Sequence, residues 1–188
     1  MNHTQTKTIA IFITLAALMA ATRVHHFSSA LHLPDASLAI FLLAGFYLPL
    51  WAFPALLVEA GLVDYVAINY GGVDGWCFSP AYWFLIPTYA VLWFAGRYYA
   101  RIHQYSLRGL GVFSGIALVA VSAAFFVSNA SFYWFSGLFP DMGMGEYAAS
   151  VAQYYRPYLT SAGVYLIPAT LLHVLFTHRA GTAHSAVK

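Results

Sequence analysis

Long apolar runs separated by short polar stretches dominate the pattern along the chain. The five strongest runs cover residues 8–22, 36–53, 81–96, 109–127 and 158–177. Each run approaches the roughly 20 residues that a helix needs to cross about 30 Å of hydrocarbon. The short alternating strands typical of an outer-membrane barrel are missing from the sequence. The pattern therefore predicts an all-α integral membrane protein with a single transmembrane domain over residues 1–188.

A sixth segment, residues 54–69, is less apolar because it contains Glu59 and Asp64. Carboxylates that face lipid are costly, so we expect these side chains to face the protein interior or water. A single helix over residues 36–69 would be about 51 Å long, which exceeds the thickness of the membrane. We therefore predict a tight turn near Trp51–Pro54 and six helices in total.

The placement of arginine predicts the orientation of these helices. Arg97, Arg101 and Arg108 crowd one short connection, and connections rich in Lys and Arg face the cytoplasm. With six helices, both termini are then cytoplasmic, and Arg23 lies on the opposite side of the membrane. The three connections expected on that outer side are residues 23–35, 70–80 and 128–157.

The composition supports a membrane protein and excludes several functions. Hydrophobic residues make up 61% of the chain and charged residues 7%, whereas soluble domains carry roughly 25% charged residues. The eight Lys and Arg residues form no basic stripe that would bind nucleic acid, and no G-x-x-x-x-G-K loop is present for a nucleotide. The chain therefore does not hydrolyse nucleotides by that route.

The last outer connection, residues 128–157, is unusually long and aromatic. Connections of this length are uncommon unless they are functional or disordered, and the aromatic content argues against disorder. Its aromatic residues include Phe132, Tyr133, Trp134, Phe135, Phe139, Tyr147, Tyr154 and Tyr155, and Tyr158 follows directly after it. They are suited to lining a large, flat, partly apolar ligand, with Asn129, Gln153 and Arg156 as polar contacts. The alternative is a lid that packs on the helix ends.

The connection at residues 70–80 contains Cys77, the only cysteine of the chain. It follows three glycines and precedes Pro80, which predicts a turn rather than a helix core. A single cysteine excludes an internal disulfide. Four roles remain for it: a buried apolar residue, a redox thiol, a metal ligand, or a nucleophile activated by a base such as His25 or His26.

Two kinds of metal site are compatible with one thiolate. Zinc would need further ligands such as His25, His26 and Asp64, whose spacing matches no zinc motif. A metal enclosed in a macrocycle, as in haem or cobalamin, needs one soft axial ligand, which Cys77 can supply. A membrane-embedded haem or quinone redox protein is the main alternative, with His25, His26 and His173 as ligands. A structural subunit whose loops dock a partner is the third hypothesis.

Two stretches of the sequence resemble a known family. They are HHFSSALHLPDASLAIFLLAGFYLPLW at residues 25–51 and GWCFSPAYWF at residues 75–84. With the expected six short helices, they resemble the BtuM family of bacterial cobalamin transporters, solitary relatives of the S components of energy-coupling-factor transporters. The resemblance implies a six-transmembrane-helix bundle of the S-component type. It also implies that the protein binds the corrinoid at the periplasmic face of the inner membrane and transports it to the cytoplasm.

The resemblance also implies a set of site residues. In that family a cysteine of an outer loop is the upper axial ligand of cobalt, and the matching residue here is Cys77. Polar contacts or supports are expected from His25, Asp64, Tyr82 and Arg156. Aromatic contacts are expected from Trp76, Phe78, Tyr133 and Trp134. The alternative roles are a helix cap for His25, an interfacial anchor for Tyr82 and a lipid headgroup contact for Arg156.

Two further expectations follow from the resemblance. S components dock on a coupling subunit through small residues of the first helix, and Ala16/Ala20 and Ala17/Ala21 have that spacing. Such a spacing also serves ordinary helix packing. In addition, a thiolate on the upper face of cobalt competes with the ligand already there, so Cys77-dependent decyanation of cyanocobalamin is a hypothesis.

Overall fold

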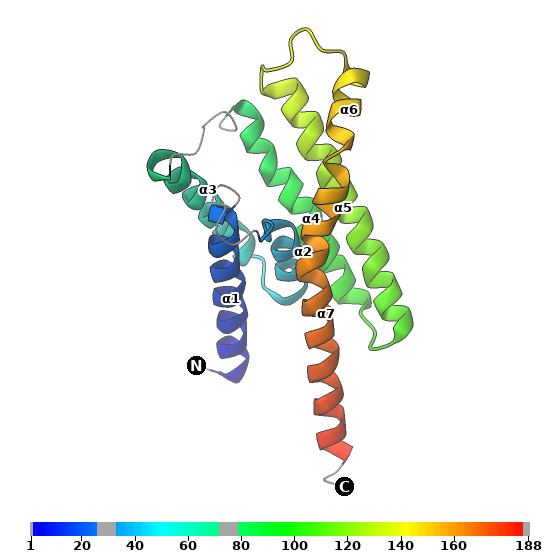
Figure 1. Cartoon of the computed structure of the whole chain (residues 1–188). Helices are drawn as coiled ribbons and strands as arrows, with labels where there is room; N and C mark the ends of the chain where they lie inside the picture. The colour runs from blue at the N-terminus through cyan, green and yellow to red at the C-terminus, as the bar shows by residue number, and fades with distance from the viewer. Residues whose placement is uncertain (1, 26–32, 72–78, 186–188) are drawn as a thin grey trace.

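The computed structural model describes residues 2–25, 33–71 and 79–185, and these residues form helices and no strand (Figure 1). In chain order the helices are α1 (His3–His25), α2 (Ser37–Tyr47), α3 (Ala52–Tyr70), the 3-10 helix η2 (Pro80–Phe84), α4 (Leu85–Ile102), α5 (Leu107–Phe135), α6 (Met144–Ala152) and α7 (Tyr155–Ser185). The expectation of an all-α protein is confirmed for the described residues.

Within the described residues, three helices are long and apolar enough to cross a membrane. They are Thr4–Arg23, Ala52–Tyr70 and Leu107–Phe135, and the apolar helix α2 is shorter. The segment that carries Glu59 and Asp64 is therefore one of the three. These helices indicate a membrane protein, whereas the six-helix S-component bundle stays a prediction.

A break separates the second and third helices as predicted, but it lies at residues 48–51 rather than near Trp51–Pro54, and Pro54 is inside α3. Helix α2 ends at Tyr47 and α3 begins at Ala52. Leu48 between them is extended, with φ −109° and ψ 152°. Pro49 follows, and a proline disfavours helical geometry in the residue before it. Helix α2 is consequently shorter than the predicted run of residues 36–53, because the proline ends it early.

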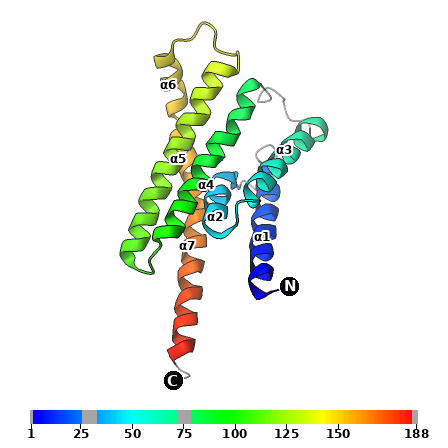
Figure 2. The ribbon, with the colours of Figure 1, turned by 180° about the vertical axis from the view of Figure 1, so that it is seen from behind.

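The long connection predicted at residues 128–157 is mostly helical. Helix α5 continues to Phe135, and the described turn that follows leads into α6 and then α7 (Figure 2). Gly137 has a φ of 74°, a left-handed conformation that favours glycine and ends the preceding helix. The aromatic residues at positions 132–135 therefore lie on a helix rather than in a loop.

Helix α2 is the centre of the core, because it packs against α1, α3, α4 and α7 (Figure 1). Its contact with α4 depends on two glycines. A Cβ added at Gly45 would lie 2.1 Å from the carbonyl oxygen of Trp93, and one added at Gly96 would lie 2.0 Å from that of Leu42. Glycine at both positions lets the two backbones approach closely, as is common between membrane helices.

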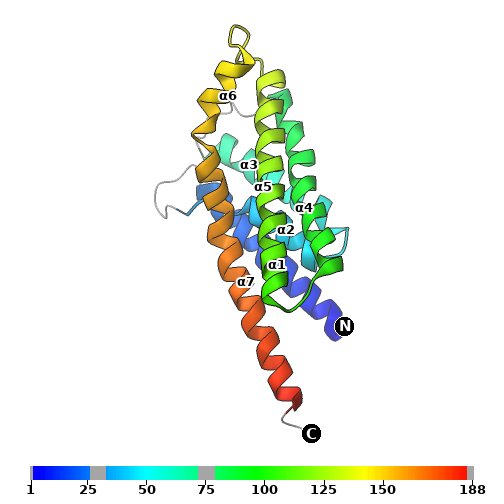
Figure 3. The same ribbon diagram turned by 90° about the vertical axis from the view of Figure 1, so that its right-hand side faces the viewer.

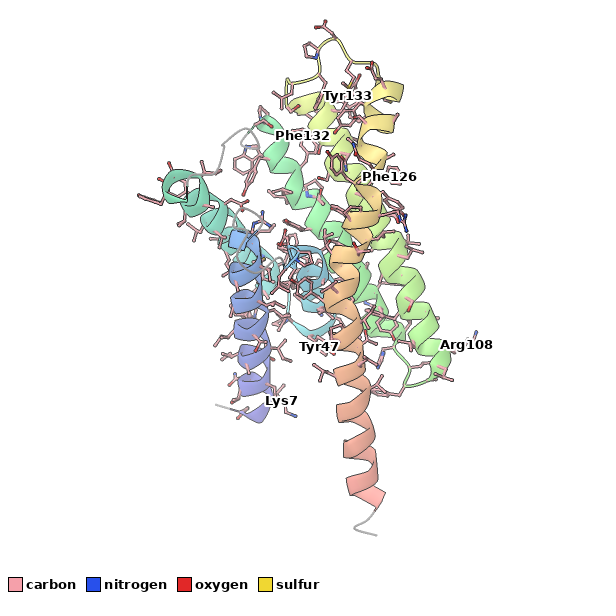
Figure 4. All side chains as sticks on the ribbon, viewed as in Figure 1. Lys7, Tyr47, Arg108, Phe126, Phe132 and Tyr133 are labelled. Atoms are coloured by element: carbon pink, nitrogen blue, oxygen red, sulfur yellow. The ribbon has the colours of Figure 1, made fainter. Side chains whose placement is uncertain are left out.

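The helices place both termini toward one end of the molecule. Phe41 stacks on Tyr89 and Phe46 packs on Tyr99, so α2 and α4 run in the same direction. The termini point to the same end as the α4–α5 connection, where Figure 4 shows Arg108 (Figures 1 and 4). Helix α7 runs beside α5 and extends beyond it toward the C-terminus (Figure 3). This arrangement agrees with the prediction that both termini lie on one side of the membrane. The assignment of that side to the cytoplasm stays a prediction.

Candidate ligand-binding site

A cavity of about 850 Å³ is lined by Arg23 near the end of α1, by Asp35 before α2 and by Phe139 in the turn between α5 and α6. Residues of α1, α2, α3, η2, α4, α5, α6 and α7 line it. A cavity of this size is at the upper end of the roughly 300–1,000 Å³ typical of small-molecule sites. It is therefore large enough for a sizeable ligand.

Arg23, at the end of α1, is the most highly connected side chain in the cavity wall. Its Nε and Nη2 each donate to a different carboxylate oxygen of Asp64, both at 2.6 Å. Its Nη1 donates to Ser37 Oγ at 2.9 Å and to Tyr89 Oη at 2.8 Å. Arg23 is 7% exposed, so the charge is buried with a bidentate partner, which is the strongest geometry for such a pair.

Asp64 and Tyr82, two of the predicted site residues, lie together in this wall. Tyr82 Oη donates to Asp64 Oδ2 at 2.7 Å, and both residues line the cavity. The carboxylate is thus held by α1 through Arg23 and by η2 through Tyr82. The carboxylates of this helix were expected to face the protein interior or water, and Asp64 faces the protein interior.

Asp35 is the second carboxylate of the wall and precedes α2. Its Oδ1 accepts from the backbone N of Ser37 at 2.9 Å and from Ser37 Oγ at 2.6 Å. Its Oδ2 lies 3.7 Å from Arg23 Nη1, which is an ion pair but too long for a hydrogen bond. Tyr165 of α7 donates to the carbonyl oxygen of Pro34 at 2.5 Å. Both α2 and α7 therefore hold the turn that carries Asp35.

Aromatic side chains of α5, α6 and the turn between them form another part of the wall. Tyr147 Oη donates to the carbonyl oxygen of Asn129 at 3.1 Å, and Tyr133 Oη donates to that of Met142 at 2.8 Å. The ring centroids of Phe139 and Tyr147 are 4.8 Å apart. These contacts fix α6 on α5, so the wall is part of the packed structure.

Some of the aromatic and polar residues predicted as contacts in this region line the cavity, and others do not. The predicted residues that line the cavity are Asn129, Phe132, Phe139, Tyr147, Gln153, Tyr154 and Tyr158. Tyr133 packs behind Tyr147 with ring centroids 4.9 Å apart, and Trp134 is 60% exposed. Arg156 is exposed as well. These three residues are outside the lining of the cavity.

The predicted cobalt ligand Cys77, with Trp76 and Phe78, lies outside the described residues, as does His26. His25 is the last residue of α1, and its side chain also lies outside the described part. The lining residues nearest to Cys77 in the sequence are Ile68 before it and Ala81 after it. The described wall therefore includes residues on both sides of this segment in the sequence.

His173, one of the three histidines named for the haem alternative, lies at the other end of α2. Its Nδ1 is 2.6 Å from Tyr47 Oη, and its ring lies 5.2 Å from that of His103, edge to face at 78°. Axial histidines of a haem lie on opposite faces of the macrocycle, whereas these two rings contact each other. No macrocycle fits between them. The described residues also contain no group of three His, Cys, Asp or Glu side chains that could hold a metal ion.

The sequence did not identify Arg23, Asp35, Ser37 or Tyr89 as site residues. A signal for Arg23 was present, because it is an arginine on the predicted outer side, where the positive-inside rule expects few. Its partner could not be identified, because Asp64 is 41 positions away in the chain.

The charges in the described wall are one guanidinium and two carboxylates, from Arg23, Asp35 and Asp64. The remaining lining side chains are aromatic, aliphatic, hydroxyl and amide groups. Such a surface suits a large ligand with an apolar body and neutral polar substituents. No protein-family model matches the chain, and no curated protein matches its sequence.

Proposed function

We propose that the protein binds cobalamin in this cavity, at the periplasmic face of a bacterial inner membrane, and transports it toward the cytoplasm. The observation that carries the proposal is the cavity of about 850 Å³ with aromatic and neutral polar walls, in a chain with membrane-spanning helices. Cobalamin has a broad corrin ring with primary carboxamides around its rim. Aromatic side chains suit the ring, and hydroxyl and amide side chains suit the rim.

The charge balance of the wall favours cobalamin over haem, the competing macrocycle. Arg23 is engaged by Asp64, Ser37 and Tyr89, and Asp35 adds a second carboxylate. The described wall is therefore net negative, which disfavours the two propionates of haem. The carboxamides of a corrinoid carry no such charge.

Cys77 is the proposed upper axial ligand of cobalt. Support comes from its position in the chain, because Ile68 and Ala81 on either side of it line the cavity. When cyanocobalamin binds, the thiolate donates an electron pair to cobalt while the cobalt–carbon bond breaks and cyanide leaves with its own pair. Cobalt keeps its oxidation state, so this ligand exchange needs no reductant.

The first test is spectroscopic. Purified protein is mixed with cyanocobalamin, binding is measured by calorimetry, and the ligand exchange is followed by absorption. We expect binding and a shifted spectrum with the wild type, and an unshifted spectrum with Cys77→Ala and Cys77→Ser. A wild type that binds no cobalamin overturns the proposal. An intense Soret band in the purified protein, lost in His173→Ala, would favour a haem protein instead.

The second test measures transport in cells. A strain that lacks its own inner-membrane cobalamin importer is grown on a medium that requires the vitamin, with the wild type or an empty plasmid. Rescue by the wild type is expected. Rescue that is unchanged in Cys77→Ala would separate uptake from cobalt ligation, and failure of the wild type to rescue would reject transport while leaving binding to the first test.

A coupling subunit, if one takes part, is proposed to dock on the first helix. Ala16 packs against the core, and Ala20 is partly buried. Ala17 and Ala21 are exposed. The stripe that remains accessible to a partner is therefore Ala17/Ala21, and Ala17→Leu is the substitution that would test docking through co-purification with a coupling subunit.

A further inference from the structure

The hydrogen bonds around Arg23 leave little of its binding capacity for a ligand. A guanidinium has five N–H groups, and the bonds to Asp64, Ser37 and Tyr89 use four of them. Arg23 is also 7% exposed. It is therefore a structural cation of the wall and is poorly placed to receive an anionic group from a ligand.

The Asp64 carboxylate is similarly occupied. Oδ1 accepts from Arg23 Nε, and Oδ2 accepts from Arg23 Nη2 and from Tyr82 Oη. Its side chain is 14% exposed. Both oxygens thus have partners within the protein, and one of the partners carries a full positive charge.

Asp35 differs from Asp64 in one of its oxygens. Ser37 fills Oδ1 with two hydrogen bonds. For Oδ2, the described residues supply no hydrogen-bond donor, and its nearest cation, Arg23 Nη1, lies at 3.7 Å. The side chain is 30% exposed and lines the cavity. Oδ2 is therefore a charged acceptor at the cavity surface with capacity for a donor from the ligand.

We propose that Asp35 is a ligand-binding residue whose Oδ2 accepts an N–H from a primary carboxamide of the ligand, and that it selects amide-bearing corrinoids over those with a carboxylate in its place. The inference rests on the proposed function and names the ligand group that Asp35 recognises. An amide donates to Oδ2, whereas a carboxylate offers no proton and adds a like charge.

The position of Asp35 is fixed well enough for such discrimination. Ser37 holds Oδ1 at the first turn of α2, and Tyr165 of α7 holds the preceding carbonyl oxygen of Pro34. Ser37 is fully buried. An acceptor held by two helices cannot readily turn away from an unfavourable ligand group, so a carboxylate in that position remains beside it.

The test compares ligands that differ by one functional group. Affinities of the full-length protein are measured for cobalamin and for each derivative in which a single side-chain amide is hydrolysed to a carboxylic acid, at neutral pH. At least one derivative is expected to bind tenfold or more weakly to the wild type. In Asp35→Asn, which keeps an acceptor for Ser37 and places an amide N–H₂ at the Oδ2 position, this preference is expected to fall at least tenfold.

Glu146→Gln is the matched control, because it removes one carboxylate from the exposed side of α6 next to the lining residue Tyr147. Its preference is expected to equal that of the wild type. If the wild type binds cobalamin and all acid derivatives equally, or if Asp35→Asn keeps the wild-type preference, the inference is wrong and the proposed function stands. If the wild type binds no cobalamin, both are wrong.

Discussion

The two ends of α2 carry polar clusters of opposite character. At its first residues lies the Arg23 cluster, which consists of Arg23, Asp35, Ser37, Asp64, Tyr82 and Tyr89. At its last residues lies the His103 cluster, which consists of Tyr47, Tyr99, His103 and His173. The first cluster contains three charged groups and lines a cavity, whereas the second is built from phenols and imidazoles.

This difference indicates which end is functional. Burying charges within membrane helices is expensive, and such charges are usually kept for a function. The Arg23 cluster contains such charges, and they lie beside a cavity. In the His103 cluster, Tyr99 Oη donates to the Gly109 carbonyl oxygen and therefore accepts from His103 Nδ1. Neutral hydrogen bonds of this kind join α2, α4, α5 and α7 at low cost. We infer that one end binds and the other holds the helices together.

The largest effect is expected from removing the charge at the centre of the Arg23 cluster. Arg23→Met leaves Asp64 buried without its cation, which typically costs about 3–5 kcal/mol of stability. Thermal unfolding in detergent and cobalamin binding should both show the loss. Arg156→Met is the matched control, because Arg156 is exposed and outside the cavity lining, and it should unfold like the wild type. Equal stability of the two variants would contradict the role of the Arg23 cluster.

The close packing of α2 on α4 lies between the two clusters. Disrupting it should cause the next largest loss of stability. Gly45→Ala places a methyl group 2.1 Å from the Trp93 carbonyl oxygen, so α2 must move away from α4. Overpacking of this kind costs about 3 kcal/mol at the upper end of its usual range. Because both clusters depend on this contact, stability and cobalamin binding should fall together.

Gly111→Ala is the control for this substitution. An added Cβ at Gly111 has nothing within 4 Å, and Gly111 lies inside α5. Replacing an exposed helical glycine by alanine should therefore raise stability by roughly 0.5–1 kcal/mol. A loss in Gly111→Ala as large as that in Gly45→Ala would show that glycine itself, and not close approach, is the cause.

The helices were predictable from sequence where local chemistry decides their ends. The length of the apolar runs indicated where helices lie. Pro49 explains why α2 and α3 are separate. The extension of α5 to Phe135 and the presence of α6 were not predicted. Aromatic residues occur both in helices and in loops that cover a site, so their enrichment alone did not distinguish the two structures.

The site was predictable only in part, for a related reason. Asp64 was found because a carboxylate in an apolar helix is conspicuous in the sequence itself. Asp35 was not, because nothing in its local sequence shows that Arg23 and the cavity lie beside it. Pairing between residues distant in the chain depends on the packing of α1, α2 and α3, which a pattern of apolar residues does not specify.

A smaller effect should separate the two clusters by function. Tyr82→Phe removes the hydroxyl that donates to the charged Asp64, and Tyr47→Phe removes the one that contacts His173. We expect losses of about 2 kcal/mol and about 1 kcal/mol, since hydrogen bonds to charged groups contribute more. Calorimetry should show weaker cobalamin binding for Tyr82→Phe alone. Weaker binding for Tyr47→Phe would mean that the His103 cluster also serves the site.

The smallest effect concerns pH and is confined to the His103 cluster. His103 follows the last residue of α4, and burial lowers the pKa of its imidazole below the ordinary value. The folded state therefore favours the neutral ring, so its contribution to stability is complete above the unfolded pKa of about 6.5 and is lost as the pH falls through and below that value. The adjacent His173 ring, 5.2 Å away, makes a second positive charge there still less favourable.

His103→Gln stays neutral at every pH and can still donate to Tyr99, so its unfolding temperature should fall less than that of the wild type between pH 7.5 and pH 5. An equal fall in both proteins would show that other groups cause the acid sensitivity.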